Sequence, residues 1–237
     1  TRNSSSQPVD KCKSYAELCA YLYPKIKEKY PDVTLFGMVP SNVTTGKEGY
    51  EWFEGTLKAG AAEYMDGISI HIYQWYGSPL TYNKYEELTN AYELMKKYGY
   101  EDKPLWITET GYSSNYEDVN SEEMQAWYNV QSYIIFQEGD LVERIYLHQA
   151  MDGYANRMRT EREANFGMFE SVPNNSTLVD DGEVTNSAKP FFLGITNMNS
   201  LMYDAEYVNK IDFSENTKCY QFKRTNSNKD LIALFSN

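Results

Sequence analysis

The chain has 237 residues, of which 41% are hydrophobic and 24% are charged, a composition that is ordinary for a globular protein. Its formal net charge of −12 would be repelled by the phosphates of nucleic acids and by anionic membrane surfaces, so we expect neither as a partner and a neutral substrate fits best. No apolar run approaches the roughly 20 residues that a membrane-spanning helix needs.

Four β-type runs alternate with helical patterns through the first 200 or so residues. A helix is predicted from Ser14, and Pro24 inside it should bend or split it. The predicted strands are 33–38, 66–73, 104–108 and 144–150, and the helices that follow them are 50–64, 82–98, 121–138 and 190–202. A long loop, 152–185, separates the last strand from the last helix. This alternation predicts an α/β fold, with a parallel sheet and helices outside it.

From Tyr207 onward the pattern changes to three short β-type runs, at 207–213, 219–224 and 231–235. Turns that contain Asn and Ser separate them, which is typical of antiparallel strands. We therefore predict a β/α domain over residues 1–203 and a small β-rich appendage over residues 204–237.

The segment Pro104–Tyr112 has the character of a buried strand that ends in a carboxylate. Leu105–Ile107 is a short apolar run after a proline, Glu109 follows almost at once, and Gly111 would let the backbone turn sharply. Barrels built from alternating strands and helices present catalytic groups in this way, at the carboxyl ends of their strands. The alternative is a surface glutamate that merely ends a strand.

Three motifs in chain order resemble the second half of a clan A glycoside hydrolase, nearest to the family 39-like group. They are Asp66–Tyr73 with its His-x-Tyr end, Trp106–Gly111, and Asp152-Gly153 with Glu163–Gly167 and Lys189-Pro190. In that group these motifs form the sixth strand, the seventh strand with the catalytic nucleophile, and the eighth-strand loop with the final helix. The resemblance implies the second half of a (β/α)8 TIM barrel, with about four strand–helix units.

The resemblance also implies a retaining glycosidase that acts on a polysaccharide or oligosaccharide, with Glu109 as its nucleophile. That chemistry needs a second carboxyl group about 5 Å away as acid/base. In this group the second carboxyl belongs to an Asn-Glu pair on the fourth strand, but Asn186 and Asn216 are not followed by Glu. We therefore expect the acid/base residue in a missing N-terminal half, and we expect this chain alone to be inactive.

Half a barrel would expose two sheet edges and apolar surface. We therefore expect a partner chain that carries the N-terminal half, or self-association. The alternative function is a non-catalytic carbohydrate-binding or scaffolding half-barrel. It is favoured by the missing half and by Tyr146–Gln149, which lacks the Trp that clan A enzymes usually place on strand eight as a floor for the sugar.

Six further residues are predicted to contact the substrate: His71, Tyr73, Trp75, Tyr76, His148 and Glu163. Tyr73 would hydrogen-bond the nucleophilic carboxylate and hold it ionised, although with 22 tyrosines in the chain a packing role is the alternative. His71 would bind a sugar hydroxyl or orient Tyr73, and a structural histidine is nearly as good an interpretation.

The remaining candidates also have structural alternatives. Trp75 and Tyr76 would stack on a sugar ring or pack within their own loop. For His148, contact with the substrate and a purely structural role are equally good interpretations. Glu163 would reach a hydroxyl group or pair with Arg159 and Arg162, and we favour the structural role for it.

No metal or cofactor is predicted. The chain has two histidines without metal-ligand spacing, and it has no Gly-rich phosphate loop or Cys-x-x-Cys pair. Cys12 and Cys19 lie on one predicted helix at a separation of about 10 Å, which is too far for a disulfide. Cys219 would pair with one of them, or all three are reduced. The first residues look like the interior of a longer protein, which we expect to be extracellular or at the cell surface.

Overall fold

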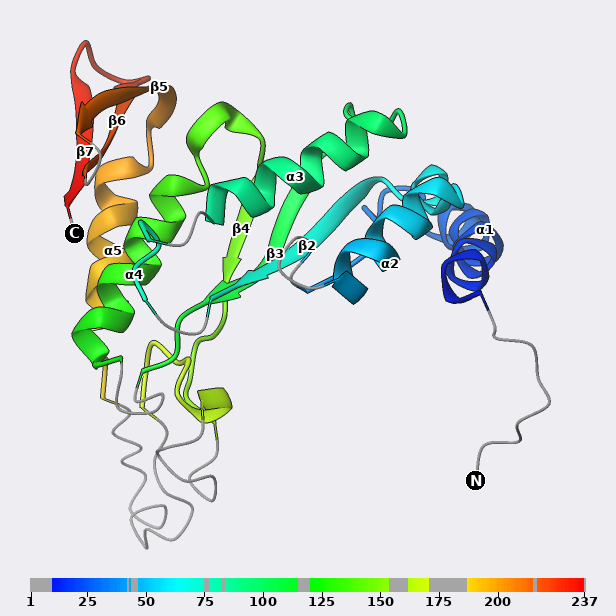
Figure 1. Cartoon of the computed structure of the whole chain (residues 1–237), viewed down its shortest axis with the longest axis horizontal. Coiled ribbons are helices and arrows are strands. Elements are labelled where there is room, and N and C mark those ends of the chain that lie inside the picture. Colours follow the sequence, from blue (N-terminus) through cyan, green and yellow to red (C-terminus); the bar gives the residue numbers. More distant parts are fainter. Residues whose placement is uncertain are drawn as a thin grey trace, which may run out of the picture. The chain divides into compact units, whose positions relative to one another are not determined.

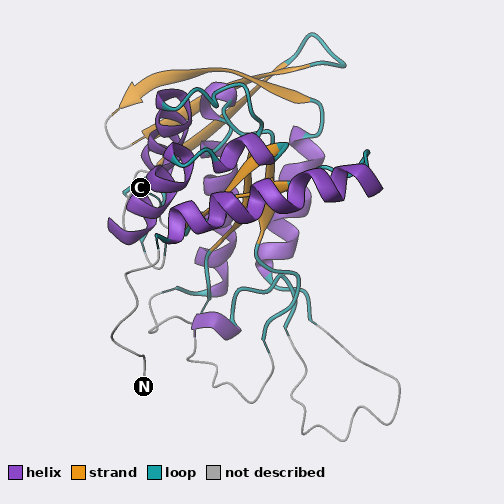
Figure 2. Cartoon of the chain, turned by 90° about the vertical axis from the view of Figure 1, so that its right-hand side faces the viewer, coloured by secondary structure: helices purple, strands orange, loops and turns teal. Residues whose placement is uncertain are grey.

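The computed structural model describes residues 10–41, 43, 47–74, 77–81, 84–114, 120–153, 162–170, 187–214 and 217–236. These residues form a four-stranded sheet, a three-stranded sheet and the helices that connect the strands (Figure 1, Figure 2). The chain divides into two compact units, which are treated in turn. Unit 1 comprises Thr1–Ile72, Glu86–Thr108 and Val142–Arg144, and unit 2 comprises Tyr73–Tyr85, Glu109–Leu141 and Ile145–Asn237.

The order of the elements confirms the predicted α/β alternation. They are α1 (Lys11–Lys29), β1 (Phe36–Gly37), α2 (Lys47–Lys58), η1 (Ala61–Tyr64), β2 (Gly67–Tyr73), α3 (Lys84–Lys97), β3 (Leu105–Gly111), α4 (Glu122–Ile135), η3 (Glu138–Asp140), β4 (Arg144–Leu147), η4 (Arg162–Ala164), α5 (Pro190–Met202), β5 (Ala205–Ser214), β6 (Thr217–Arg224) and β7 (Asp230–Ser236). Strands β1 to β4 lie in sequence order in the parallel sheet, and β5 to β7 form the antiparallel one.

Several predicted boundaries were wrong. The helix predicted over 50–64 is split into α2 and η1, because Gly60 adopts a left-handed conformation with φ of 80°. The first and last strands of the parallel sheet are shorter than predicted. Pro24 lies inside α1, which continues on both sides of it. All three cysteines are free. Among the helices in the described part of the chain, none has both the length and the apolar character that a membrane crossing requires.

In unit 1, flat side chains stack on one face of the parallel sheet. The rings of Phe36 on β1 and Trp106 on β3 lie 3.8 Å apart between centroids, and the guanidinium of Arg144 lies 5.1 Å from the Trp106 ring. The Trp106 indole N–H donates to the Glu143 carboxylate at 3.0 Å. Gly67 on the intervening strand makes this stacking possible, since a Cβ there would come within 2.2 Å of the Phe36 ring.

Asp66 ties α1 to the start of β2. Its carboxylate accepts hydrogen bonds from the Tyr23 hydroxyl and the Leu35 N–H, each at 2.7 Å, and pairs with the Lys27 ammonium at 2.7 Å. Burial alone would raise the pKa of Asp66, but these three donors hold it below its ordinary value. The ionised form of Asp66 therefore stabilises the folded state.

We expect Asp66→Asn to lower the free energy of unfolding by about 1–2 kcal/mol at neutral pH. Because the folded-state pKa is depressed, the stabilisation is present above the ordinary Asp pKa and is lost as the pH falls through the folded value. The difference between wild type and variant should therefore shrink below about pH 4. Urea unfolding from pH 7 to pH 3 measures this difference, and a constant difference would contradict the assignment. Glu17→Gln, which breaks the exposed pair with Lys13, serves as a control and should cost under about 0.5 kcal/mol.

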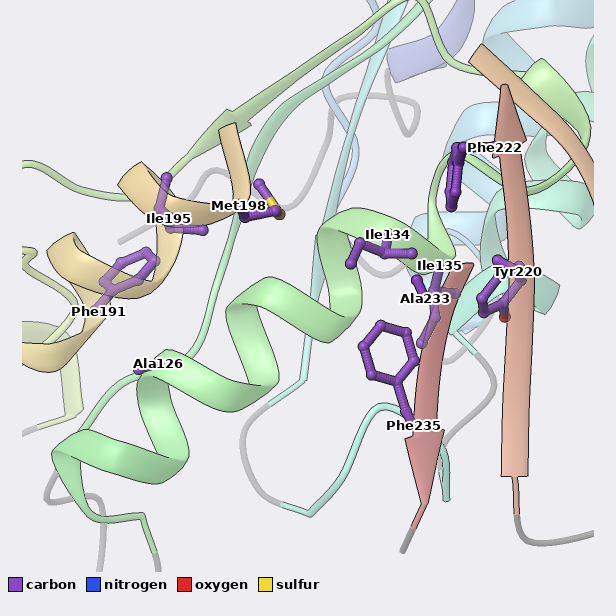
Figure 3. Packing of buried hydrophobic residues seen from close by; sticks show 10 residues of the cluster. All are labelled: Ala126, Ile134, Ile135, Phe191, Ile195, Met198, Tyr220, Phe222, Ala233 and Phe235. Atoms are coloured by element: carbon purple, nitrogen blue, oxygen red, sulfur yellow. The ribbon is translucent and has the colours of Figure 1, made fainter. Parts of the chain in front are cut away.

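In unit 2, helices α4 and α5 share a core with the antiparallel sheet (Figure 3). The core consists of Ala126, Ile134 and Ile135 on α4, Phe191, Ile195 and Met198 on α5, and Tyr220, Phe222, Ala233 and Phe235 on β6 and β7. Ser121 caps α4 by accepting a hydrogen bond from the Met124 N–H, and Pro190 occupies the first turn of α5, where its missing N–H costs nothing.

Candidate active site

The carboxyl ends of β2 and β3 bring two of the predicted residues together within unit 2. Tyr73 ends β2, Glu109 lies near the end of β3, and the two strands are neighbours in the parallel sheet. The Tyr73 hydroxyl donates a hydrogen bond to Oε2 of Glu109 at 2.8 Å. Both side chains are partly exposed. This hydrogen bond fixes the orientation of the Glu109 carboxylate relative to the Tyr73 ring.

The Tyr73 phenol is held in its protonated form. Burial, the hydrogen bond to Glu109 and the charges of Glu109 and Glu163 all raise the pKa of Tyr73 far above its ordinary value. Tyr73 is therefore a constant hydrogen-bond donor at any physiological pH. Glu163, whose charge contributes to the raised pKa of Tyr73, is itself exposed.

Three rings, which we call the aromatic triad, meet beside this pair: Tyr73, His148 and Phe166. Their centroids are 6.2 Å apart for Tyr73 and His148, 5.7 Å for Tyr73 and Phe166, and 5.2 Å for His148 and Phe166. All three contacts are edge-to-face, which is a favourable arrangement for aromatic rings. Phe166 is 1% exposed, so it supports the two more exposed rings from within the protein.

Gly111 has a different role from the predicted one. The prediction that it turns the chain was wrong, because it is the last residue of β3 and has no left-handed backbone angle. Instead it permits a close approach, since a Cβ there would lie 2.5 Å from the carbonyl oxygen of His148 and 3.2 Å from the Phe166 ring. The His148 N–H also donates to the Thr110 carbonyl at 2.8 Å. Gly111 thus allows the aromatic triad to pack against the strand that carries Glu109.

A buried polar group, which we call the Lys189 network, consists of Lys189, Asp152, Ser114, Asn165 and Gly167. The Lys189 ammonium lies 3.1 and 3.2 Å from the two carboxylate oxygens of Asp152, and it donates to Ser114 Oγ at 3.0 Å and to the Asn165 carbonyl at 3.3 Å. The Gly167 N–H donates to Asp152 at 2.6 Å. Burial raises the pKa of Asp152 even though the Lys189 charge opposes this.

Helix α4 fixes the chain just beyond Glu109 through two buried amides. The Gln125 side chain donates to the carbonyl oxygens of Tyr112 and Asn165, each at 3.0 Å, and the Asn129 side chain accepts from the Tyr112 N–H at 3.2 Å. The Tyr112 hydroxyl donates to Gln74 at 2.8 Å, so the segments that follow Tyr73 and Glu109 are joined directly. Neither amide was among the residues predicted from sequence. Their signal is a pair of polar residues four apart on the buried face of a helix.

The remaining predicted site residues are His71, Trp75 and Tyr76. His71 belongs to unit 1, where its N–H donates to the Pro40 carbonyl at 2.9 Å. Trp75 and Tyr76 lie outside the described residues, as does Arg159, one of the two predicted partners of Glu163. Among the described residues, no group of three or more His, Cys, Asp or Glu side chains is arranged to hold a metal ion.

Comparison with known proteins identifies the family of the chain. The family model of the glycosyl hydrolase catalytic core matches residues 3–191. The chain belongs to the glycosyl hydrolase catalytic core family. This glycosyl hydrolase sequence is also 29% identical over 108 residues to a hyaluronoglucuronidase of Hirudo nipponia, a match that covers 40% of this chain and 22% of the relative.

Solved glycosidase structures resemble this glycosyl hydrolase chain in fold. A GH39 β-xylosidase from Caulobacter crescentus has a TM-score of 0.52 and 16% identity, over 87% of this chain and 40% of that one. A GH2 β-galacturonidase from Eisenbergiella tayi has a TM-score of 0.55 and 18% identity, over 84% and 32%. A glucosidase from Croceicoccus marinus has a TM-score of 0.56 and 13% identity, over 89% and 44%.

At these identities the likeness shows the fold alone. The chain spans less than half the length of each of these proteins and of the curated relative. The predicted resemblance to glycoside hydrolases is confirmed by the family match. The narrower assignments, to clan A, to the family 39-like group and to the second half of a TIM barrel, stay predictions.

Proposed function

We propose that this protein is a retaining glycoside hydrolase of the clan A type, nearest to family 39, which cleaves O-glycosidic bonds of a polysaccharide or oligosaccharide with Glu109 as nucleophile. The observation that carries the proposal is the 2.8 Å hydrogen bond from Tyr73 to Glu109 at the carboxyl ends of neighbouring parallel strands. Barrels of this class place their chemistry at that end of the strands. Family membership supports the reaction type.

The reaction runs by double displacement. The ionised Glu109 attacks the anomeric carbon, and the glycosidic oxygen leaves with a proton from the acid/base residue, which gives a covalent glycosyl-enzyme ester. Water then attacks the same carbon, the acid/base residue takes its proton, and the sugar departs with retained configuration. Tyr73 contributes by stabilising the carboxylate of Glu109 before attack and when the ester is broken.

We further propose that the acid/base residue is a Glu supplied by a polypeptide segment outside these 237 residues, either another part of the gene product or a partner chain. The support is that the family 39-like group carries this residue in an Asn-Glu pair, and this sequence contains no such pair. That segment would complete the (β/α)8 barrel. Glu163 and His148 are proposed to contact sugar hydroxyls beside Glu109. An extracellular or cell-surface location is also part of the proposal.

We expect Tyr73→Phe to lower kcat of the intact gene product by about 10- to 100-fold with little change in KM. The variant loses a hydrogen bond to a charged group, worth about 1.5–3 kcal/mol, and about 1.4 kcal/mol corresponds to a tenfold change in rate. Steady-state kinetics on an aryl glycoside measures it. Tyr220→Phe is the matched control, because it removes a Tyr–Glu hydrogen bond of 3.1 Å on β6. Equal activity of Tyr73→Phe and wild type would contradict the role of Tyr73.

The proposed function is tested by incubating the intact gene product with a panel of glycans and following the anomeric proton of the first product by NMR. Retention of configuration supports double displacement, and inversion contradicts it. Tight binding of a glycan without any turnover would instead favour the non-catalytic alternative, a carbohydrate-binding or scaffolding protein.

A further inference from the structure

The Lys189 network holds the chain on both sides of Phe166. The Lys189 ammonium donates to the carbonyl of Asn165, which precedes Phe166, and Asp152 accepts from the N–H of Gly167, which follows it. An ion pair of 3.1 Å joins Lys189 to Asp152 and so connects the two groups that hold Asn165 and Gly167. Phe166 in turn lies edge-on to Tyr73, whose hydroxyl holds Glu109. A continuous series of contacts therefore connects the Lys189–Asp152 ion pair, through Phe166 and Tyr73, to the carboxylate of Glu109.

We propose that Lys189 and Asp152 are positioning residues for the pair formed by Tyr73 and Glu109, and that they act through Phe166. This inference rests on the proposed function for its effect on turnover. The hydrogen bonds of Lys189 and Asp152 described above are made to Ser114, Asn165 and Gly167 and to each other, not to Glu109. Their effect is to fix where the Phe166 ring stands, and so where the Tyr73 hydroxyl points.

The ion pair and its hydrogen bonds to the backbone restrict the position of Phe166. The side chain of Lys189 is 1% exposed and that of Asp152 is 12% exposed, so water competes weakly for their contacts. Gly167 admits no side chain, since a Cβ would lie 2.1 Å from the backbone nitrogen of Asp152. The Phe166 carbonyl accepts from the Gln149 N–H at 3.2 Å. The backbone on both sides of the ring is therefore fixed by buried groups.

The competing interpretation is that the ion pair only stabilises its loop. That role predicts a loss of stability and no particular change at Tyr73. A positioning role predicts, in addition, that the environment of the Tyr73 ring changes when the pair is broken in a folded protein. The two interpretations are separated by a probe at Tyr73 that needs no substrate.

The experiment places 3-fluorotyrosine at position 73 by genetic encoding and records its fluorine NMR resonance in the full chain. Lys189→Met removes the cation of the ion pair and Asp152→Asn removes its anion, both with Phe166 unchanged, so the second variant tests the same pair if the first does not fold. Glu109→Gln calibrates the shift that accompanies a change in the hydrogen bond. Asp204→Asn is the matched control, because Asp204, which precedes β5, is 7% exposed and pairs with Arg224 on β6 at 2.9 Å.

We expect the fluorine resonance to move in Lys189→Met and in Asp152→Asn and to stay in place in Asp204→Asn. In the intact gene product the same two variants should lower kcat by about 10²-fold with KM nearly unchanged, since misplacement of a reacting group affects the transition state most. An unmoved resonance in folded Lys189→Met and Asp152→Asn would overturn the proposal, as would an equal shift in Asp204→Asn. A moved resonance in a protein that turns over no glycan would support the positioning role and count against the proposed function instead.

Discussion

Glu109→Gln should lower kcat of the intact gene product by at least about four orders of magnitude, because removal of a nucleophile eliminates the covalent route. The change replaces one carboxylate oxygen by an amide nitrogen of similar size. The amide oxygen can still accept the hydrogen bond that Tyr73 donates to the carboxylate at 2.8 Å, so the fold should be retained. Steady-state kinetics and circular dichroism on wild type and variant measure the two effects separately.

Glu163→Gln is the matched control for that prediction. Glu163 is exposed, and its charge reaches Tyr73, so the variant changes the local charge by the same amount. We expect a decrease in kcat/KM of only a few fold, since Glu163 is proposed to contact sugar hydroxyls. A further check is Glu109→Ala with added azide, which should yield a glycosyl azide of inverted configuration by direct attack on the anomeric carbon. If Glu163→Gln were the inactive variant and Glu109→Gln the active one, the assignment of the nucleophile would be wrong.

The second large effect concerns stability. Lys189→Met should lower the free energy of unfolding by about 3–5 kcal/mol, because it leaves the buried carboxylate of Asp152 without its cation. Guanidinium unfolding of the chain at pH 7 measures this loss. Lys210→Met is the control, since Lys210 pairs with Glu138 at 3.3 Å and is 34% exposed. Its loss should cost under about 1 kcal/mol.

The same variant should respond to pH in a defined direction. Burial already raises the pKa of Asp152 above its ordinary value, with Lys189 acting in the opposite sense, so loss of Lys189 should raise the pKa further. A raised folded-state pKa favours folding when the carboxyl is protonated, and that contribution is lost as the pH rises through the folded value. The loss of unfolding free energy in Lys189→Met, relative to wild type, should therefore be largest at neutral pH and shrink toward about pH 4. The double variant Lys189→Met/Asp152→Asn should lose less unfolding free energy at pH 7, relative to wild type, than Lys189→Met alone. A double variant as unstable as the single one would contradict this explanation.

The strand that carries Glu109 could be predicted from sequence because its signals are local. A proline precedes a short apolar run, and the carboxylate and a glycine follow within seven residues of its start. Tyr73 was predicted from the motif that ends β2. The strand itself depends on periodicity and side-chain type, which can be read from a few neighbouring residues. The role of Tyr73 was implied by the resemblance to the glycoside hydrolase motif that ends in His-x-Tyr.

The Lys189 network could not be predicted in the same way. Lys189 and Ser114 are 75 positions apart, and Lys189 and Asp152 are 37 apart, so their contacts depend on how the loop and the start of α5 fold together. Gly111 was misinterpreted for a related reason: its role is set by the distant His148 carbonyl, not by its own backbone angles. Likewise, the split of the helix predicted over 50–64 follows from the left-handed conformation of Gly60, which sequence permits but does not require.

The most direct test of the account is covalent trapping of the intermediate. The intact gene product is incubated with a 2-deoxy-2-fluoro glycoside that carries an activated leaving group, and the labelled peptide is mapped by mass spectrometry. The account predicts one added glycosyl group, attached to Glu109. A label on Glu163 or on any other carboxylate, in a protein that is inactivated with the expected stoichiometry, would contradict it.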